Sequence, residues 1–239
     1  LPKGWAQAVV CDRQGGELLV TSPKTAFFTF IGSGPVGWYL NSKASAGTRS
    51  ALEHGGVAPV IVEPDADIEA MIPDLVKGGF YHAGQVCVSV QRIFVHESIA
   101  DSVASKIAEK ASKLVVGDQL DPKTEVGPLI NHDEVNRVEE WVNDAVAKGA
   151  KILVGGKRIG NSCFEPTVIL NASDDAIVSN KEVFGPVVCI YSYKTLDEAI
   201  AKANSLEVSF QAAVFTKNLD VALKAVKRLN ATAVMVNDH

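Results

Sequence analysis

Short β-branched or aromatic runs alternate with amphipathic stretches along most of this chain. We interpret as strands residues 27–31, 49–53, 59–63, 91–96, 151–154, 164–170, 187–193, 210–216 and 233–236. Between them, apolar residues at three- and four-residue intervals predict helices over 38–46, 68–82 and 133–148, with others after Ser98, Thr195 and Asn218. Because strands separated by helices favour parallel pairing, the pattern predicts an α/β fold, a layered, mainly parallel sheet with helices on both faces.

Polar residues and apolar stripes define the ends and faces of these helices. Ser98 and Thr195 each precede an acidic residue by three positions, the spacing of a capping box, and Asn218 is a further predicted cap. In the helix over residues 133–148 we expect four valines to face the core: Val135, Val138, Val142 and Val146. The helix after Asn218 runs through Leu219, Leu223 and Val226.

Composition excludes several kinds of partner. The 239 residues, 47% of them hydrophobic, suffice for one large domain or two small ones. The net charge is -5 with acids and bases interspersed, so we expect no nucleic-acid partner and no binding to an anionic membrane surface. No apolar stretch approaches the roughly 20 residues of a membrane span, and the first residues lack the layout of a signal peptide.

The cysteines are few and widely spaced. Cys11, Cys87, Cys163 and Cys189 do not suit a disulfide scaffold, and no Cys-x-x-Cys or His-x-x-x-His pair suggests zinc. This usage favours a reducing, cytoplasmic environment. The chain begins without methionine and stops just after a strand-like run, so we expect a fragment of a longer protein.

Cys87 is the candidate nucleophile. It follows Gly84-Gln85-Val86, just past the predicted helix over residues 68–82, and therefore lies in a connection. A thiol becomes nucleophilic as thiolate, which requires a polarised and partly open position such as a turn. A lone cysteine, however, is more often a small buried hydrophobe, so Cys87 by itself leaves both interpretations open.

Two further stretches precede Cys87. Glycines at 32, 34 and 37 follow a predicted strand and open a predicted helix, an arrangement that suits a phosphate as well as plain steric packing. They fit the Gly-x-Gly-x-x-Gly spacing, but no acidic residue follows at the expected distance. Glu53 ends another strand before Gly55-Gly56, and by itself it is as compatible with a solvated surface carboxylate as with a catalytic group.

Together these stretches resemble the aldehyde dehydrogenase superfamily from roughly residue 20 to the end of the chain. The matching segments, in order, are Phe30-Ile31-Gly32-Ser33-x-x-Val36-Gly37, Leu52-Glu53-x-Gly55-Gly56-x-x-Pro59, Gly84-Gln85-Val86-Cys87, Arg92-Ile93-Phe94-Val95-His96, Gly127-Pro128, Glu182-Val183-Phe184-Gly185-Pro186-Val187, Ala203-Asn204 and Ala213-Val214-Phe215-Thr216. Because so many segments match in one order, we favour the catalytic interpretation of Cys87 and Glu53 over the structural one.

The resemblance implies covalent oxidation of a small-molecule aldehyde to a carboxylic acid. Cys87 would attack the carbonyl carbon, with the oxyanion held by its own backbone N–H and by an asparagine from another part of the family fold. Glu53 would activate the water that hydrolyses the thioester. The family usually carries leucine where His54 stands, so a titratable ring lies next to this base.

The resemblance also implies a cofactor, NAD or NADP. Gly32 and Ser33 would contact its pyrophosphate, Glu182 would hold the nicotinamide ribose, and Phe184 would pack beside the nicotinamide. The groups that select NAD or NADP would lie outside this chain. Residues 1-55 then correspond to the trailing part of the dinucleotide-binding domain and 56-239 to the catalytic domain.

Family members have further N-terminal and C-terminal sections, the latter used in oligomerisation. We therefore expect this chain alone to bind dinucleotide poorly and turn over slowly or not at all, and the full-length parent to be a homo-oligomer. Residues 210–215 and 234–238 are similar to the branch with lactaldehyde and non-phosphorylating glyceraldehyde-3-phosphate dehydrogenases, which suggests a small polar or anionic substrate.

Two other function classes stay open. Cys87 with His82 or His96 would form a cysteine hydrolase pair, although no oxyanion motif of a hydrolase accompanies them. Alternatively, the chain is a non-catalytic binding module that has kept the fold. Turnover that requires a nicotinamide cofactor separates the dehydrogenase from both.

Overall fold

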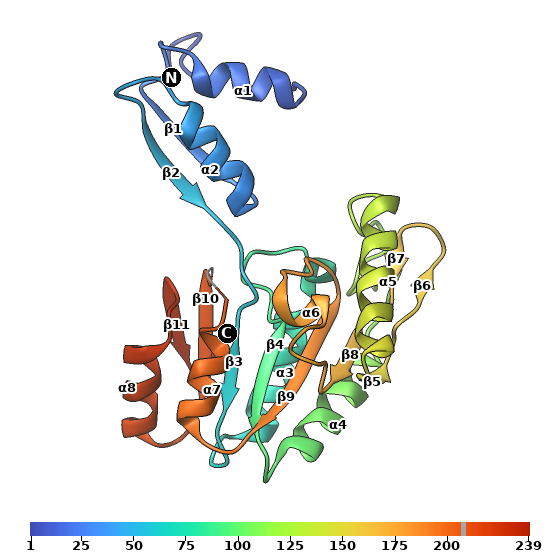
Figure 1. Ribbon diagram of the computed structural model, residues 1–239. Coiled ribbons are helices and arrows are strands. Elements are labelled where there is room, and N and C mark those ends of the chain that lie inside the picture. Colours follow the sequence, from blue (N-terminus) through green and yellow to red (C-terminus); the bar gives the residue numbers. More distant parts are fainter. Residues whose placement is uncertain (207–208) are drawn as a thin grey trace. The chain divides into compact units, whose positions relative to one another are not determined.

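The computed structural model describes residues 1–206 and 209–239. Within them the chain divides into two compact units, Leu1–His54 and Gly55–His239. Each unit has its own secondary structure (Figure 1) and is described by itself. The assignment of residues 1–55 and 56–239 to a cofactor and a catalytic domain stays a prediction.

The first unit contains one parallel strand pair and two helices. β1 (Phe27–Ile31) pairs with β2 (Arg49–Glu53), and their register runs from Phe27 opposite Arg49 to Ile31 opposite Glu53. α1 (Arg13–Thr21) is capped by Asp12, whose side chain accepts a hydrogen bond from the N–H of Gly15. α2 (Gly34–Lys43) begins inside the glycine turn, four residues before the predicted start at Trp38. Proline suits a first helical turn because it needs no N–H there, and Pro35 occupies that place.

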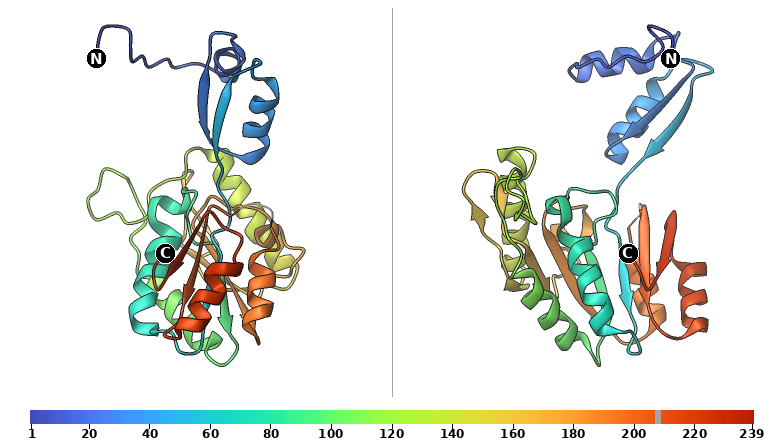
Figure 2. Two further views of the ribbon diagram at one scale, coloured as in Figure 1. Left: turned by 90° about the vertical axis from the view of Figure 1, so that its left-hand side faces the viewer. Right: turned by 180° about the vertical axis from the view of Figure 1, so that it is seen from behind.

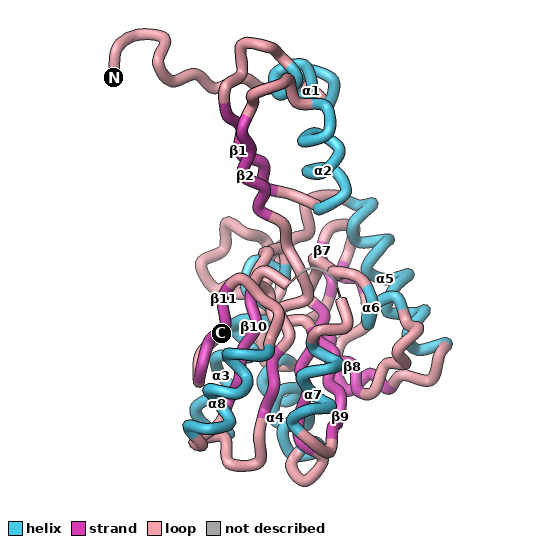
Figure 3. Tube along the Cα trace, turned by 60° about the vertical axis from the view of Figure 1, so that its left-hand side comes forward, coloured by secondary structure: helices cyan, strands magenta, loops and turns pink. Residues whose placement is uncertain are grey.

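A seven-stranded sheet forms the centre of the second unit. Its order is β11-β10-β3-β4-β9-β8-β5, and every neighbouring pair is parallel except β5 with β8. The strands are β3 (Val60–Val62), β4 (Arg92–His96), β5 (Lys151–Val154), β8 (Thr167–Leu170), β9 (Val187–Tyr193), β10 (Gln211–Phe215) and β11 (Ala233–Val236). Figure 3 shows these strands in magenta, with loops joining their ends. The predicted mainly parallel α/β sheet is confirmed.

Helices cover both faces of this sheet (Figure 2). α3 (Ile68–Phe80) and α4 (Ala100–Ala111) pack against each other on one face, and α7 (Leu196–Ala203) lies against β3, β4 and β9. The remaining helices are α5 (His132–Ala147), α6 (Ile177–Asn180) and α8 (Leu219–Arg228). The central strands are buried on both faces, as their almost continuous apolar sequences require, and they form the core together with Leu75 of α3 and Val103 of α4.

Two predictions about helix ends and faces were wrong. Ser98 caps no helix: α4 begins at Ala100 without a side-chain cap, because the Ser98 hydroxyl lies 2.8 Å from Nδ1 of His96. Val146 of α5 is 43% exposed, and Ala145 is buried instead, since it lies nearer the stripe through Val138 and Val142. The caps at Thr195 and Asn218 are confirmed.

The apolar stripe of α8 does not face the core. Leu219 and Leu223 are exposed, and the helix packs on the sheet through the small side chains of Ala222 and Ala225. The sequence of α8 allows either of two sides to be buried, because the small alanines lie on one side of the helix and the large leucines on another. Only the position of the sheet decides which side is buried.

The predicted strand over residues 164–170 is interrupted. Pro166, which has no N–H for a sheet, separates β7 (Cys163–Phe164) from β8. β7 pairs instead with β6 (Arg158–Ile159) in a separate two-stranded antiparallel sheet. Among the residues described, none of the helices has the length and apolar character to cross a membrane.

Candidate active site

Cys87 follows a left-handed turn at the end of α3. The helix stops at Phe80, and η1 (Tyr81–Gly84) then carries three consecutive residues with positive φ, His82 at 50°, Ala83 at 56° and Gly84 at 71°. The chain reversal predicted at Gly84 therefore begins two residues earlier. Left-handed backbone at residues with a side chain is unfavourable and persists where surrounding contacts enforce it.

Gly84 packs directly against the loop that follows α6. A Cβ atom at this position would lie 2.5 Å from the carbonyl carbon of Gly185 and closer still to its oxygen. Both the positive φ and this close backbone approach require glycine. The turn before the nucleophile is thereby fixed against the segment that carries Glu182 and Phe184.

Two side chains brace the Cys87 segment. Gln85 donates from Nε2 to the carbonyl oxygens of His82 and Pro128, both at 3.2 Å, and its Oε1 accepts from the N–H of Ile130 at 2.9 Å. Ser89 donates from its hydroxyl to the carbonyl oxygen of Gly78 at 3.2 Å. These bonds hold the Cys87 segment in place, and Cys87 itself is half-buried rather than enclosed in the core.

The other cysteines of this unit differ from Cys87 in burial. Cys163 and Cys189 are buried, and burial raises the pKa of the Cys189 thiol to about 12. Burial, and then the charge of Cys87, raise the pKa of the Tyr81 hydroxyl, which stays protonated near neutral pH. Of these three thiols, only that of Cys87 is both accessible and placed in a turn, as the predicted nucleophile should be.

Glu182 contacts the start of the second unit. Its Oε1 accepts a hydrogen bond of 3.0 Å from the backbone N–H of Gly56, and a Cβ at Gly55 would lie 2.7 Å from its Cδ. Burial raises the pKa of this carboxyl, while the Gly56 N–H and the charge of Arg137 act in the opposite direction. Glu182 is thus a half-buried carboxylate on a glycine cradle.

A small cavity of about 10 Å³, enough for roughly one water molecule, lies between the Cys87 segment and the loop that carries Glu182 and Phe184. The Cys87 segment contributes Gly84, Val86 and Ser89 to its wall, and the facing loop contributes Glu182 and Phe184. The structure therefore brings the segment of the predicted nucleophile next to the two predicted nicotinamide-binding residues of this unit. Cys87 itself is not part of the cavity wall.

The predicted phosphate turn lies in the first unit. Ser33 precedes α2, and its exposed hydroxyl makes no capping bond, while the first helical turn leaves backbone N–H groups free of helical partners. A Cβ at Gly34 would meet no other atom closer than the His54 ring at 4.0 Å, whereas one at Gly37 would lie 2.5 Å from that ring, so His54 packs against one side of this first turn. Nδ1 of His54 lies 3.3 Å from the carbonyl oxygen of Gly32.

These groups fit parts of a nicotinamide dinucleotide. A helix N-terminus without a side-chain cap, preceded by a serine, suits an anionic phosphate, and a carboxylate such as Glu182 suits ribose hydroxyls. Phe184 is 42% exposed and presents an aromatic ring beside that carboxylate. Within residues 1–206 and 209–239 there is no group of three or more histidine, cysteine or acidic side chains that could hold a metal ion.

Glu53 ends β2 and has an exposed side chain. It belongs to the first unit and Cys87 to the second, so their encounter in one cavity stays a prediction.

The histidines of the hydrolase interpretation are poorly placed. His96 is the last residue of the strand β4, about 13 Å along the strand from its first residue, Arg92, whereas Cys87 comes before the strand begins. The exposed ring of His82 packs beside Tyr81 with centroids 5.2 Å apart.

Sequence reasoning missed two side chains that shape the site. Gln91 and Arg137 both bond the backbone of the loop that carries Glu182 and Phe184. Gln91 is an uncharged polar residue at the start of the strand-like run over residues 91–96, and such a side chain needs hydrogen-bond partners when it is buried. For Arg137, an exposed-looking residue on a helix, no comparable signal exists.

The chain is similar to known proteins over its full length. A model described as "Aldehyde dehydrogenase family" matches residues 1–239. The 3-sulfolactaldehyde dehydrogenase of Priestia aryabhattai is 43% identical over 239 residues, which are 100% of this chain and 50% of that protein. The mitochondrial succinate-semialdehyde dehydrogenase of Arabidopsis thaliana is 40% identical over 226 residues, 93% of this chain and 43% of that protein.

Solved structures give the same picture. Glyceraldehyde-3-phosphate dehydrogenase GapN from Methanocaldococcus jannaschii, complexed with NADP, has a TM-score of 0.89 at 40% identity, covering 93% of this chain and 48% of that chain. Aldehyde dehydrogenase 21 from Physcomitrella patens, in complex with the reaction product succinate, has a TM-score of 0.91 at 36% identity, covering 95% and 47%. The chain spans about half the length of the relatives it matches.

Proposed function

This chain belongs to the aldehyde dehydrogenase family, and from that premise we propose that the protein containing it oxidises a small aldehyde to a carboxylic acid with NAD or NADP. The observation that supports this most is the setting of Cys87. Its accessible thiol follows a strained left-handed turn that packs against the Glu182–Phe184 loop. Strain of this kind tends to gather at functional sites.

Cys87 and Glu53 carry the proposed chemistry. The Cys87 thiolate adds to the aldehyde carbon, a carbon–sulfur bond forms, and the carbonyl electron pair moves to oxygen, where the backbone N–H of Cys87 stabilises it. Collapse of this adduct leaves a thioester on Cys87. Glu53 then takes a proton from water, which attacks the thioester, and the acid and the thiolate separate. When bound, NAD or NADP supplies the acceptor for the hydride lost from the substrate carbon.

The cofactor contacts follow from the two units taken separately. We propose that Gly32 and Ser33 hold the pyrophosphate at the start of α2, and that Glu182 and Phe184 hold the nicotinamide end. The half-buried state of Glu182, with its raised pKa and its bond from Gly56, supports a carboxylate kept in one orientation. A fixed acceptor loses less entropy when it binds ribose hydroxyls.

We also propose a small polar or anionic aldehyde as substrate, cytoplasmic location, and a homo-oligomeric full-length protein. Two relatives support the substrate class, since sulfolactaldehyde and succinate semialdehyde each carry an anionic group. We expect residues 1–239 alone to bind dinucleotide weakly. Size-exclusion chromatography of the protein with its natural flanking sequence measures the oligomeric state.

The decisive experiment is aldehyde-dependent reduction of NAD and NADP by the protein with its natural flanking sequence. We expect activity with succinate semialdehyde or lactaldehyde, and its loss in Cys87→Ala. A Glu53→Gln variant should still acylate Cys87 but release acid slowly, since the general base is removed. Full activity of Cys87→Ala would show that the nucleophile is wrong, and ester cleavage without any dehydrogenase activity would favour the hydrolase.

A further inference from the structure

The loop Lys181–Pro186 carries Glu182 and Phe184 without any regular secondary structure. It joins α6 to β9, and Phe184 within it has a φ of 47°, in the left-handed region. An aromatic residue adopts this conformation at a cost and keeps it where neighbours enforce it. The loop must therefore be held by contacts from other elements.

Gln91, the residue immediately before β4, makes two of those contacts and a third bond to α6. Its Oε1 accepts a hydrogen bond of 2.7 Å from the N–H of Val183, and its Nε2 donates to the carbonyl oxygens of Lys181 at 2.8 Å and Val178 at 2.9 Å. The side chain is 4% exposed, and all its bonds reach the backbone of α6 and the loop. The two loop residues that it bonds flank Glu182.

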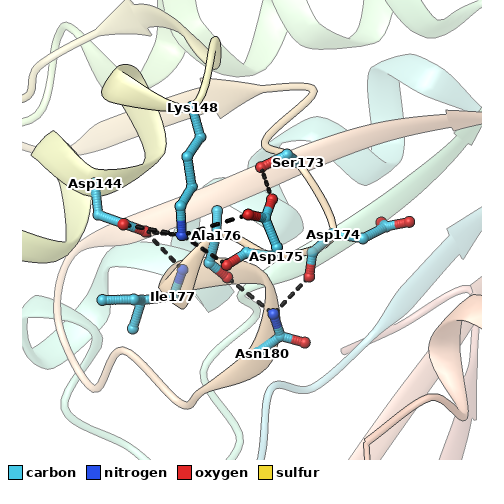
Figure 4. A network of polar contacts seen from close by, with 8 residues as sticks. All are labelled: Asp144, Lys148, Ser173, Asp174, Asp175, Ala176, Ile177 and Asn180. Atoms are coloured by element: carbon cyan, nitrogen blue, oxygen red, sulfur yellow. Dashed lines mark hydrogen bonds and ion pairs between the residues drawn. The ribbon is translucent and has the colours of Figure 1, made fainter.

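Two further side chains hold the loop and the helix that precedes it. Arg137 of α5 donates from a guanidinium nitrogen to the carbonyl oxygen of Val183 at 2.7 Å, and its guanidinium lies 4.5 Å from the centre of the Trp141 ring. The backbone N–H and the carbonyl oxygen of the buried Val183 are thus both hydrogen-bonded by side chains, those of Gln91 and Arg137. At the start of α6, Asp144 accepts from the N–H of Ile177 at 2.9 Å within a network that includes Lys148 (Figure 4).

We propose that Gln91 is a positioning residue that sets Glu182 and Phe184 for the nicotinamide end of the cofactor. Gln91 follows Cys87 by four positions, so its side chain connects the segment that carries the candidate nucleophile to the loop Lys181–Pro186. No other side chain described here bonds both the residue before Glu182 and the residue after it. The inference rests on the proposed function for the cofactor, whereas the holding of the loop is independent of it.

The test compares Gln91→Met, which keeps the length of the side chain but removes its three hydrogen bonds, with Thr216→Val. Thr216 is equally buried and bonds Asp65, away from the loop, so its variant controls for the loss of a buried polar group. Amide hydrogen exchange at Val183 should accelerate about tenfold or more in Gln91→Met and stay unchanged in Thr216→Val. Equal exchange at Val183 in both variants overturns the proposal.

The second readout is steady-state kinetics of the protein with its natural flanking sequence. In Gln91→Met the KM for the dinucleotide should rise about tenfold, with a smaller change in kcat, because loss of an orienting contact weakens binding. Faster exchange with an unchanged KM overturns the assignment toward the cofactor. If the wild-type protein reduces neither NAD nor NADP, the proposed function fails, and the exchange result still decides whether Gln91 holds the loop.

Gln91→Glu is the variant to use if Gln91→Met does not fold. Its charged form turns an oxygen toward the carbonyl groups of Lys181 and Val178, so the dinucleotide KM should fall as the pH is lowered and the carboxyl regains a donor hydrogen. The charged side chains near residue 91 are Arg92, Arg137 and Glu182. They are present in wild type as well, so measuring the KM of wild type at each pH controls for their titration. A KM equal to that of wild type at every pH overturns the proposal.

Discussion

Gly84→Ala perturbs a close backbone contact between the turn before Cys87 and the loop Lys181–Pro186. The new Cβ would lie 2.5 Å from the carbonyl carbon of Gly185 and 3.1 Å from the nitrogen of Pro186, both of them backbone atoms that cannot rotate away. The left-handed conformation costs an L residue about 1–2 kcal/mol. Overpacking adds about 1–3 kcal/mol, so we expect a loss of about 2–5 kcal/mol in the free energy of unfolding.

Gly149→Ala is the matched control for this substitution. Gly149 also has a positive φ, 91°, but a Cβ there would meet no atom within 4 Å. It should therefore show only the conformational cost, about 1–2 kcal/mol. Urea denaturation of wild type and both variants, with m-values checked for equality, measures the difference. If Gly84→Ala costs no more than Gly149→Ala, the close packing of the turn against Gly185 does not exist, and the argument for a rigid nucleophile segment fails.

Three further predictions concern reactivity, pH and packing. In the folded protein, iodoacetamide should modify Cys87 long before Cys189, because Cys189 is buried with a raised pKa; peptide mass spectrometry reads this out, and equal rates would contradict it. Burial raises the pKa of Glu182, so this carboxyl binds a proton more readily in the folded state than in the unfolded state. Its contribution to stability is therefore present in acid and is lost as the pH rises from about 4 through the folded pKa. Glu182→Gln should gain stability relative to wild type across that window, and thermal melts from pH 4 to 7 measure the difference. Leu75→Ala, at a fully buried site, should cost about 2–5 kcal/mol, whereas Leu223→Ala, at a site 58% exposed, should change stability by less than about 0.5 kcal/mol in the same urea titration.

Hydrophobic periodicity was sufficient to predict the class of fold and most elements. Parallel strands buried on both faces need unbroken apolar runs, and residues 187–193 carry such a run almost unchanged into β9. Ends and faces were predicted less well, because they depend on neighbours. The Ser98 hydroxyl found the His96 ring, and Pro166 divided one predicted strand between two sheets.

The candidate site divides in the same way. The resemblance to the aldehyde dehydrogenase family pointed to Cys87, Glu182 and Phe184, because these residues lie in short segments that match the family's motifs. The side chains that hold those segments in place, Gln91 and Arg137, come from other elements and reach loop backbone far away in sequence. A local pattern carries no information about such partners.

The amino-acid sequence alone determined the alternation of strand and helix, which depends on residue types at short range, and the family and the candidate nucleophile, which depend on the order of short motifs along the chain. Tertiary structure decided which face of α8 is buried, how far the left-handed turn extends, and which buried amide meets the free backbone groups around Glu182. The reason is physical: a backbone N–H or C=O outside a helix or sheet must find a partner when it is buried, and only the folded chain determines which side chain is within reach.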